Sequence, residues 1–188
     1  MQMRIISGEF KGREINFLKN SNTRPLKDAV KENIFNILKH SNKIKIKIEN
    51  SNILDLYSGI GSFGIECISR GAVKVTFVEK EENAVKLLKE NLINLSIISR
   101  SKIYDSEINE ILTKKLKEKF QIFFLDPPFK NFDYFQNLES IKKNKLYKKD
   151  HIIIIHREKK SKEDIGKLLK IILIKNYGRS KIIFGRFN

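Results

Sequence analysis

The chain has 188 residues, 40% of them hydrophobic, which suffices for one domain with its own core and a small appendage. Its 38 Lys and Arg residues outnumber 22 Asp and Glu residues, and the net charge of +16 indicates a polyanionic partner, most simply nucleic acid. No apolar run is long enough to span a bilayer, and we expect no signal peptide. The single cysteine, Cys67, excludes an internal disulfide framework.

These properties predict a cytoplasmic protein. Cys67 falls in a predicted helix, where it is better interpreted as a small buried hydrophobe than as a nucleophile. The three histidines have no metal-ligand spacing with cysteines or carboxylates, so we predict no metal site.

Residues 1–50 are predicted to form a separate N-terminal extension. Its pattern indicates two short strands, then a helix that Pro25 can open, and then a Lys/Ile alternation typical of either a strand or a charged linker. These segments lie at 4–6, 13–17, 26–38 and 43–49.

From residue 52 onward, strands alternate with helices, a pattern that predicts a mostly parallel sheet covered on both faces. Strands are expected at 52–56, 73–78, 102–104, 121–125 and 151–155. Helices are expected after a glycine-rich turn as far as Arg70, and at 83–95, 108–119 and 162–169. Two final strands, 170–177 and 179–186, meet at Gly178 and predict an antiparallel hairpin. Residues 51–188 are therefore predicted to form one α/β domain.

A glycine-rich turn, Asp55-Leu-Tyr-Ser-Gly-Ile-Gly-Ser-Phe-Gly64, joins the first parallel strand to its helix. Glycines allow a tight turn and the close approach of a ligand to the backbone. Glu79 ends the next strand, where a carboxylate can accept hydrogen bonds from ribose hydroxyls. The glycines at 59, 61 and 64 also match the dinucleotide fingerprint G-x-G-x-x-G, so an NAD(P)-dependent oxidoreductase is a competing interpretation.

The motif Asp126-Pro127-Pro128-Phe129 follows a short apolar strand. The prolines fix φ and remove two N–H donors, so the Asp126 carboxylate and nearby carbonyls remain as acceptors beside the Phe129 ring. Such a turn suits a planar ring that carries an exocyclic amine. A hydride-transfer enzyme has no evident need for it, and Asp55 suits a cationic sulfonium cofactor better than a pyrophosphate. Both turns are expected at the carboxyl ends of central strands, where open α/β sheets bind ligands.

Together the two motifs resemble S-adenosylmethionine-dependent methyltransferases that act on exocyclic amines of nucleobases. Further runs resemble, more narrowly, RsmD-type 16S ribosomal RNA (guanine-N2)-methyltransferases, and the similarity is strongest over 4–80 and 121–130. These runs are Arg4-Ile-Ile-Ser-Gly8, Gly12-Arg13, Arg24-Pro25, Glu32-Asn-Ile-Phe-Asn-Ile-Leu38 and the segment from Asp55 to Ala72. The sequence departs from the family pattern at Leu26 (usually Thr), Lys31 (typically Arg) and His156 (often acidic).

The resemblance implies a Rossmann-like class I methyltransferase fold. Its mostly parallel seven-stranded sheet would have helices on both faces and a C-terminal antiparallel hairpin, and the N-terminal extension would help to hold RNA. The site residues implied are Asp55, Gly59 and Gly61 at the methionine end of the cofactor, Glu79 at its ribose, Asp105 or Glu107 at its adenine, and Asp126, Pro127 and Phe129 in the catalytic turn. RNA phosphates would be bound by Arg4, Arg13, Arg24 and Lys27.

The expected activity is methyl transfer to the N2 amine of a guanine in 16S ribosomal RNA, within the small subunit or its precursor, by a monomeric enzyme. An adenine-N6 methyltransferase acting on DNA or RNA is an alternative, because an acid-Pro-Pro-aromatic turn serves that amine too. The oxidoreductase and a non-catalytic RNA-binding module are further alternatives.

Overall fold

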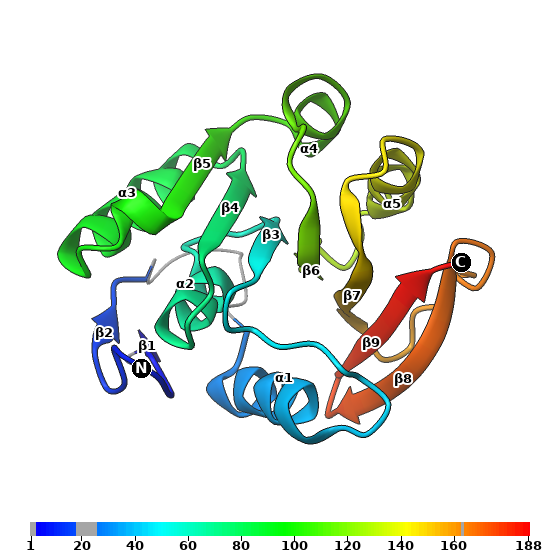
Figure 1. Cartoon of the computed structure of the whole chain (residues 1–188), viewed down its shortest axis with the longest axis horizontal. Helices are drawn as coiled ribbons and strands as arrows, with labels where there is room; N and C mark the ends of the chain where they lie inside the picture. The colour runs from blue at the N-terminus through cyan, green and yellow to red at the C-terminus, as the bar shows by residue number, and fades with distance from the viewer. Residues whose placement is uncertain (1–2, 18–25, 163) are drawn as a thin grey trace.

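The computed structural model describes residues 3–17, 26–162 and 164–188, and its centre is a seven-stranded sheet (Figure 1). The strands are β3 (Asn52–Leu56), β4 (Lys74–Glu79), β5 (Ser101–Asp105), β6 (Phe120–Leu125), β7 (Tyr147–Glu158), β8 (Leu169–Tyr177) and β9 (Ser180–Phe187). Their order is β5-β4-β3-β6-β7-β9-β8. The first five are parallel, whereas β9 runs antiparallel to both β7 and β8. The predicted fold class is confirmed, including the hairpin at Gly178.

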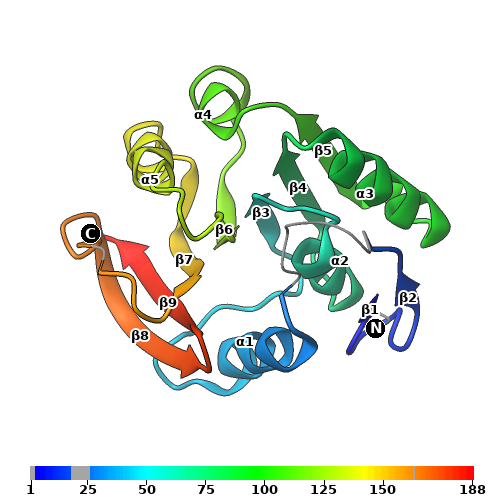
Figure 2. The same cartoon turned by 180° about the vertical axis from the view of Figure 1, so that it is seen from behind.

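Helices cover both faces of this sheet, as Figures 1 and 2 show. On one face lie α1 (Asp28–His40), α2 (Ser62–Ser69) and α3 (Glu82–Asn94). On the other lie α4 (Ile108–Glu110), which continues into a π-helical turn, and α5 (Tyr134–Lys143). Successive strand residues point to opposite faces, so Ile53 joins the first layer of the core and Leu54 the second.

The structure corrects two predicted helices and chooses between the two interpretations of a third segment. The predicted helix at 162–169 is wrong: the described residues there form turns, and Leu169 already pairs with Phe187 of β9. The predicted helix at 108–119 ends at Lys115, because the chain must become extended before β6 begins at Phe120. Residues 43–49 form no strand, which confirms the linker interpretation.

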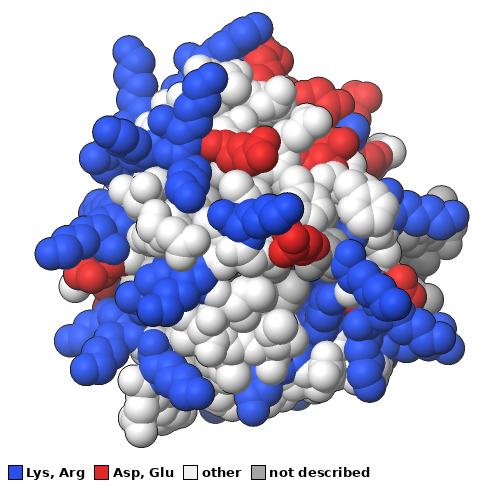
Figure 3. Space-filling model, turned by 90° about the vertical axis from the view of Figure 1, so that its right-hand side faces the viewer, with Lys and Arg blue, Asp and Glu red and all other residues white. Residues whose placement is uncertain are grey.

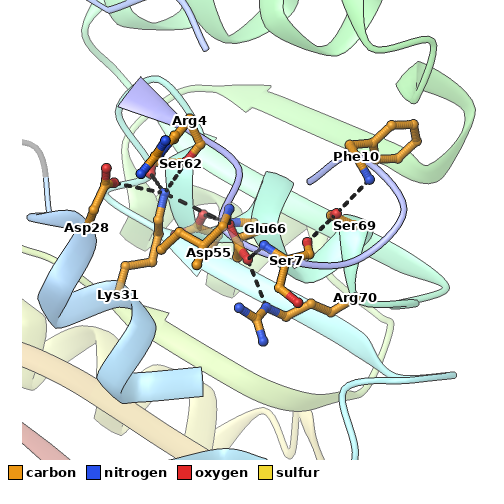
Figure 4. Close-up of polar contacts among 12 residues, drawn as sticks. Arg4, Ser7, Phe10, Asp28, Lys31, Asp55, Ser62, Glu66, Ser69 and Arg70 are labelled. Carbon is orange, nitrogen blue, oxygen red and sulfur yellow. Dashed lines mark hydrogen bonds and ion pairs between the residues drawn. The ribbon is translucent and has the colours of Figure 1, made fainter. Parts of the chain in front are cut away.

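The described part of the N-terminal extension shares its core with the sheet. Strands β1 (Met3–Arg4) and β2 (Glu14–Ile15) form a two-stranded antiparallel sheet, and their apolar side chains join the layer that contains α1, α2 and α3. Figure 4 shows polar contacts that attach this extension to α2, among them those of the buried carboxylate of Glu66. It accepts hydrogen bonds from the backbone N–H groups of Ile6 (2.8 Å) and Ser7 (3.0 Å).

Two cations surround this carboxylate. Arg70 Nε donates to it at 2.8 Å, and Lys31 Nζ lies 4.0 Å away. Lys31 is fully buried, which lowers its pKa, and it also donates to the Arg4 carbonyl (3.3 Å) and to Ser62 Oγ (3.1 Å). Because α2 begins directly after the glycine-rich turn, this network fixes the extension to the element that supports that turn.

Lys and Arg side chains are spread over the face that Figure 3 shows, and the acidic side chains of that face lie mainly in its upper part.

In the described ranges, no helix is both long and apolar enough to cross a membrane.

Candidate active site

A cavity of about 590 Å³ lies at the carboxyl ends of β3, β4, β6 and β7. Its walls include the segments that directly follow β3, β4, β5 and β6, together with His156 of β7, so the parallel topology brings distant motifs together. The site residues predicted from the sequence that line this cavity are Asp55, Gly59, Glu79, Glu107, Asp126, Pro127 and Phe129.

Asp55 lines this cavity with a side chain that is only partly satisfied. Its Oδ2 accepts from the Gly64 N–H at 3.0 Å, whereas its buried Oδ1 has no hydrogen-bond partner among the described residues. Burial raises the pKa of Asp55 well above its ordinary value. The Gly64 hydrogen bond lowers this pKa, whereas the nearby charges of Asp126 and Glu79 raise it further. A cationic group bound beside Oδ1 would satisfy this acceptor and stabilise its charge.

The three glycines of the turn are required for different structural reasons. Gly59 has φ 53°, its N–H donates to Glu79 Oε2 at 2.8 Å, and a Cβ there would meet nothing within 4 Å. Gly61 also has positive φ, but a Cβ there would lie 2.4 Å from Leu88. A Cβ on Gly64 would lie 2.3 Å from Phe77. Packing of α2 against β4 and α3 therefore explains the last two glycines of the dinucleotide fingerprint without a pyrophosphate. Gly61, unlike Gly59, does not line the cavity.

Glu79 is held rigidly at the cavity wall. Besides Gly59, the N–H groups of Lys80 (2.8 Å) and Glu81 (3.0 Å) donate to its carboxylate. A carboxylate has about four acceptor positions, so one remains for a ligand hydroxyl.

The loop after β5 contributes Ser106, Glu107, Ile108 and Asn109 to the cavity wall. Glu107 is exposed and pairs with Lys80 at 3.0 Å. Asp105 ends β5, is exposed and does not line the cavity, so of the two predicted adenine contacts only Glu107 reaches the wall.

The Asp126-Pro-Pro-Phe turn is held from β7. The fully buried Arg157 donates to the carbonyls of Pro128 (3.1 Å) and Phe129 (2.9 Å), and its guanidinium lies over the Tyr134 ring at 4.7 Å. His156, its neighbour in the chain, makes a hydrogen bond of 2.8 Å between its Nδ1 and Asp126 Oδ1. The acidic group of the motif is therefore oriented by a side chain that the turn itself does not contain.

Sequence reasoning missed several residues of the site. Tyr57, which has φ 57°, lines the cavity, and its hydroxyl accepts from Asn137 of α5 at 2.7 Å. The apolar spacing of Tyr134, Leu138 and Ile141 could have revealed α5. An arginine two residues after the apolar run Ile152–Ile155 of β7 could likewise have marked Arg157 as an inward-facing partner.

The three predicted RNA-binding residues that the structure describes do not line the cavity. Arg4 and Lys27 are exposed, and the exposed Arg13 donates to the Asn94 carbonyl at 2.9 Å. Arg24 lies outside the described residues. Phe17 and Leu26, from the same extension, do line the cavity, so this part of the chain reaches the site.

Comparison with known proteins agrees with this geometry. A family model described as conserved hypothetical protein 95 matches residues 3–186. Ribosomal RNA small subunit methyltransferase D of Buchnera aphidicola is 35% identical over 156 residues, which cover 83% of this chain and 76% of that relative. A putative rRNA methyltransferase of Bacillus subtilis is 33% identical over 171 residues, with coverage of 89% and 90%. Among solved structures, a putative methylase from Haemophilus influenzae is 27% identical, with a TM-score of 0.78 and 100% coverage of both chains.

Proposed function

The chain belongs to the family described as conserved hypothetical protein 95, and on that premise we propose that it methylates the N2 amine of a guanine in 16S ribosomal RNA. It is an S-adenosylmethionine-dependent ribosomal RNA methyltransferase. The part that we propose is the choice of the guanine N2 amine, which must be argued from the site. The observation that carries the proposal is that one cavity is lined by both Asp126 and Asp55, whose Oδ1 has no hydrogen-bond partner within the described part of the chain.

The residues present fit S-adenosylmethionine. The buried Oδ1 of Asp55 is an acceptor for a cationic ligand, and Glu79 offers a fixed carboxylate to ribose hydroxyls. The loop that contains Glu107 and Ile108 offers both polar and apolar contacts to the adenine. When bound, the cofactor supplies an electrophilic methyl group on a sulfonium centre.

Asp126 and Phe129 would hold the acceptor base. The lone pair of an exocyclic amine is conjugated with the ring, so the amine is a poor nucleophile. Hydrogen bonds from its N–H groups to Asp126 and to the Pro127 carbonyl orient that lone pair and stabilise the positive charge that develops on nitrogen. Stacking of an extruded base on Phe129 contributes about 1–3 kcal/mol.

The basic surface would bind the RNA backbone. We assign phosphate contacts to Arg4, Arg13, Arg24 and Lys27 of the extension, which position the substrate without selecting the base. The substrate is proposed to be the small subunit or its precursor, and the enzyme a cytoplasmic monomer.

Methyl transfer from labelled S-adenosylmethionine to unmodified small ribosomal subunits tests the proposal, with genomic DNA as a parallel substrate. The products are digested to nucleosides and identified by mass spectrometry. N2-methylguanosine from the RNA is the expected product. N6-methyladenine would overturn the base assignment, and transfer to neither substrate would refute the proposed activity.

A further inference from the structure

Phe132 is an exposed aromatic residue in the loop between the Asp126-Pro-Pro-Phe turn and α5. Its exposed fraction is 58%, and of the Phe and Tyr residues that the structure describes it is the only one that is neither buried nor half-buried. The other large hydrophobic side chains that are exposed in the described ranges are aliphatic. Single exposed aliphatic side chains are common on protein surfaces, but an exposed phenyl ring offers a flat face on which a base can stack.

Phe132 lies at the mouth of the cavity rather than inside it. Its two neighbours in the chain, Asn131 and Asp133, line the cavity, whereas Phe132 does not. Phe129, which is expected to stack on the target base, lines the cavity and precedes Phe132 by three residues. The Phe132 ring is therefore available to a nucleotide outside the cavity, next to the one whose base is inside.

The loop holds this ring in place before any ligand binds. The N–H of Asn131 donates to the Pro128 carbonyl at 2.8 Å, and the N–H of Phe135 donates to the Phe132 carbonyl at 3.1 Å. Asn131 Nδ2 also donates to Asp133 Oδ2 at 3.0 Å, and the Asp133 N–H donates to Asn131 Oδ1 at 2.9 Å. A pre-organised ring loses little conformational entropy when it binds a ligand.

The buried Arg157 connects Phe132 to the catalytic turn. Its guanidinium lies over the Phe132 ring, 5.6 Å from the centroid, while it donates to the carbonyls of Pro128 and Phe129. Phe132 is nonetheless more than half exposed, so part of the ring packs on the cation and the rest is open to a ligand. One side chain thus positions both the turn that receives the target base and the ring at the mouth.

A base that enters the cavity as part of an RNA chain brings its two neighbours with it. Consecutive nucleotides are covalently joined, so the nucleotides before and after the target must lie at the mouth. The net charge of +16 favours such a polyanionic chain, and the exposed Lys130, two residues from Phe132, offers a cation to its backbone.

We propose that Phe132 stacks on the base of a nucleotide adjacent to the target guanine and thereby binds the RNA at the mouth of the cavity. The inference rests on the proposed function and deepens it, because it adds a contact to a second nucleotide. Every base has a π-face, so this contact contributes affinity without selecting a sequence.

Substitutions at Phe132 separate stacking from packing. Phe132→Tyr and Phe132→Trp keep an aromatic face, Phe132→Leu keeps only apolar volume, and Phe132→Ala removes both. We expect the Ala and Leu variants to raise KM for small ribosomal subunits about 10-fold while kcat stays within about 2-fold, and the two aromatic variants to resemble the wild type. A ring that only supports the turn through Arg157 would instead lower kcat and the urea midpoint of unfolding. That result, or a Leu variant equal to the wild type, would overturn the inference.

Fluorescence measures the stacking directly. The chain contains no Trp, so Phe132→Trp introduces a single indole at the mouth. Its emission should be quenched when small subunits are added, after subtraction of the signal obtained with the wild-type enzyme. Ile174→Trp is the matched control, because Ile174 is 46% exposed on β8, which does not line the cavity. Equal quenching of the two variants would contradict the inference.

An abasic nucleotide in the RNA identifies the partner. Small subunits are rebuilt around 16S RNA that lacks the base on the 5′ or on the 3′ side of the target guanine. The wild type should lose about 10-fold in kcat/KM at one of these two positions, and Phe132→Ala should lose nothing further there. Equal losses in both proteins at both positions would refute the contact.

Failure of the proposed function gives a different result. A wild-type enzyme inactive on unmodified small subunits would refute the proposed function and this inference with it. An active wild type whose Phe132→Ala variant has the same KM and the same abasic penalties would refute only the role of Phe132.

Discussion

Arg157 donates to the backbone carbonyl of Phe129 at 2.9 Å, so the end of β7 holds the loop that follows β6. Its second donor reaches the Pro128 carbonyl, and the planar fork of Arg can serve both oxygens at once. The turn therefore depends on a buried cation as well as on its two prolines.

Arg157→Lys should loosen this turn, because an ammonium group cannot match the fork and at least one of the two carbonyls loses its donor. We expect destabilisation by about 1–3 kcal/mol and a drop in kcat of about 10-fold. Urea unfolding and single-turnover methyl transfer measure the two effects. An unchanged kcat would mean that the prolines alone hold the turn.

Asp126→Ala should leave cofactor binding nearly intact and reduce methyl transfer by about 100-fold or more, because it removes the acceptor that orients the amine. Calorimetry with S-adenosylmethionine and a labelled-methyl assay separate these effects. Loss of cofactor affinity with transfer retained would contradict the assignment of Asp126 to the base.

Asp55 predicts a specific dependence of stability on pH. Burial raises the pKa of this carboxyl in the folded chain above its ordinary value of 3.8, so the unfolded chain releases its proton first as pH rises. The contribution of Asp55 to the free energy of unfolding, without ligand, therefore falls as pH rises above 3.8 towards the folded pKa.

Asp55→Asn removes this pH-dependent loss. The variant should gain stability relative to wild type as pH rises from about 4 towards neutrality, and it should bind the cofactor more weakly. Urea unfolding across this pH range measures the difference between the two proteins. A difference that does not change with pH would show that Asp55 is already ionised in the unliganded fold.

Charge removal tests the basic extension. Arg4→Ala combined with Lys27→Ala should weaken RNA binding and make the dependence of log K on log salt shallower, by about 0.7–0.9 in slope for each phosphate that is no longer neutralised. Lys148→Ala with Lys149→Ala is the matched control, because these exposed residues lie near the amino end of β7, away from the cavity. Equal slopes in both double variants would indicate only a general charge effect. Arg13→Ala with Arg24→Ala extends the test.

The Glu66 network predicts a stability effect that a second substitution can reverse. Glu66→Ala leaves the buried Lys31 with Asp28 as its remaining carboxylate and two backbone N–H groups without their acceptor, and should cost about 3–5 kcal/mol. Adding Lys31→Met should recover part of this loss. Thermal or urea unfolding of the three proteins measures it, and a double variant no more stable than Glu66→Ala would show that the backbone hydrogen bonds dominate.

The elements that were predictable have strong local patterns. The strand Asn52–Leu56 was located in full, because a short apolar run before glycines has few other interpretations. The predicted helix at 162–169 was wrong because its spacing of Ile165, Leu168 and Leu169 also suits a turn that leads into β8, and pairing with β9 decided between them.

The motifs of the site were predictable, but the side chains that orient them were not. Asp126 and Phe129 are visible in the sequence because the prolines between them leave so few conformations. His156 and Arg157 act across the sheet, 30 and 29 residues from their partners Asp126 and Pro128. Only the register of β6 with β7 brings them together, and that register is a property of the fold rather than of any segment.

The position of β9 in the sheet constrains the order in which the protein can be built during synthesis. β9 follows β8 in the chain but lies between β7 and β8, and within the described sheet β8 pairs only with β9. Until residues 180–187 leave the ribosome, β7 is an open edge and β8 has no strand to pair with. The nascent chain thus carries an apolar strand with one open edge, on which His156 and Arg157 lie, until β9 has been made. Chains that stall or misfold at this stage should expose β7, which makes this strand the expected binding site for chaperones.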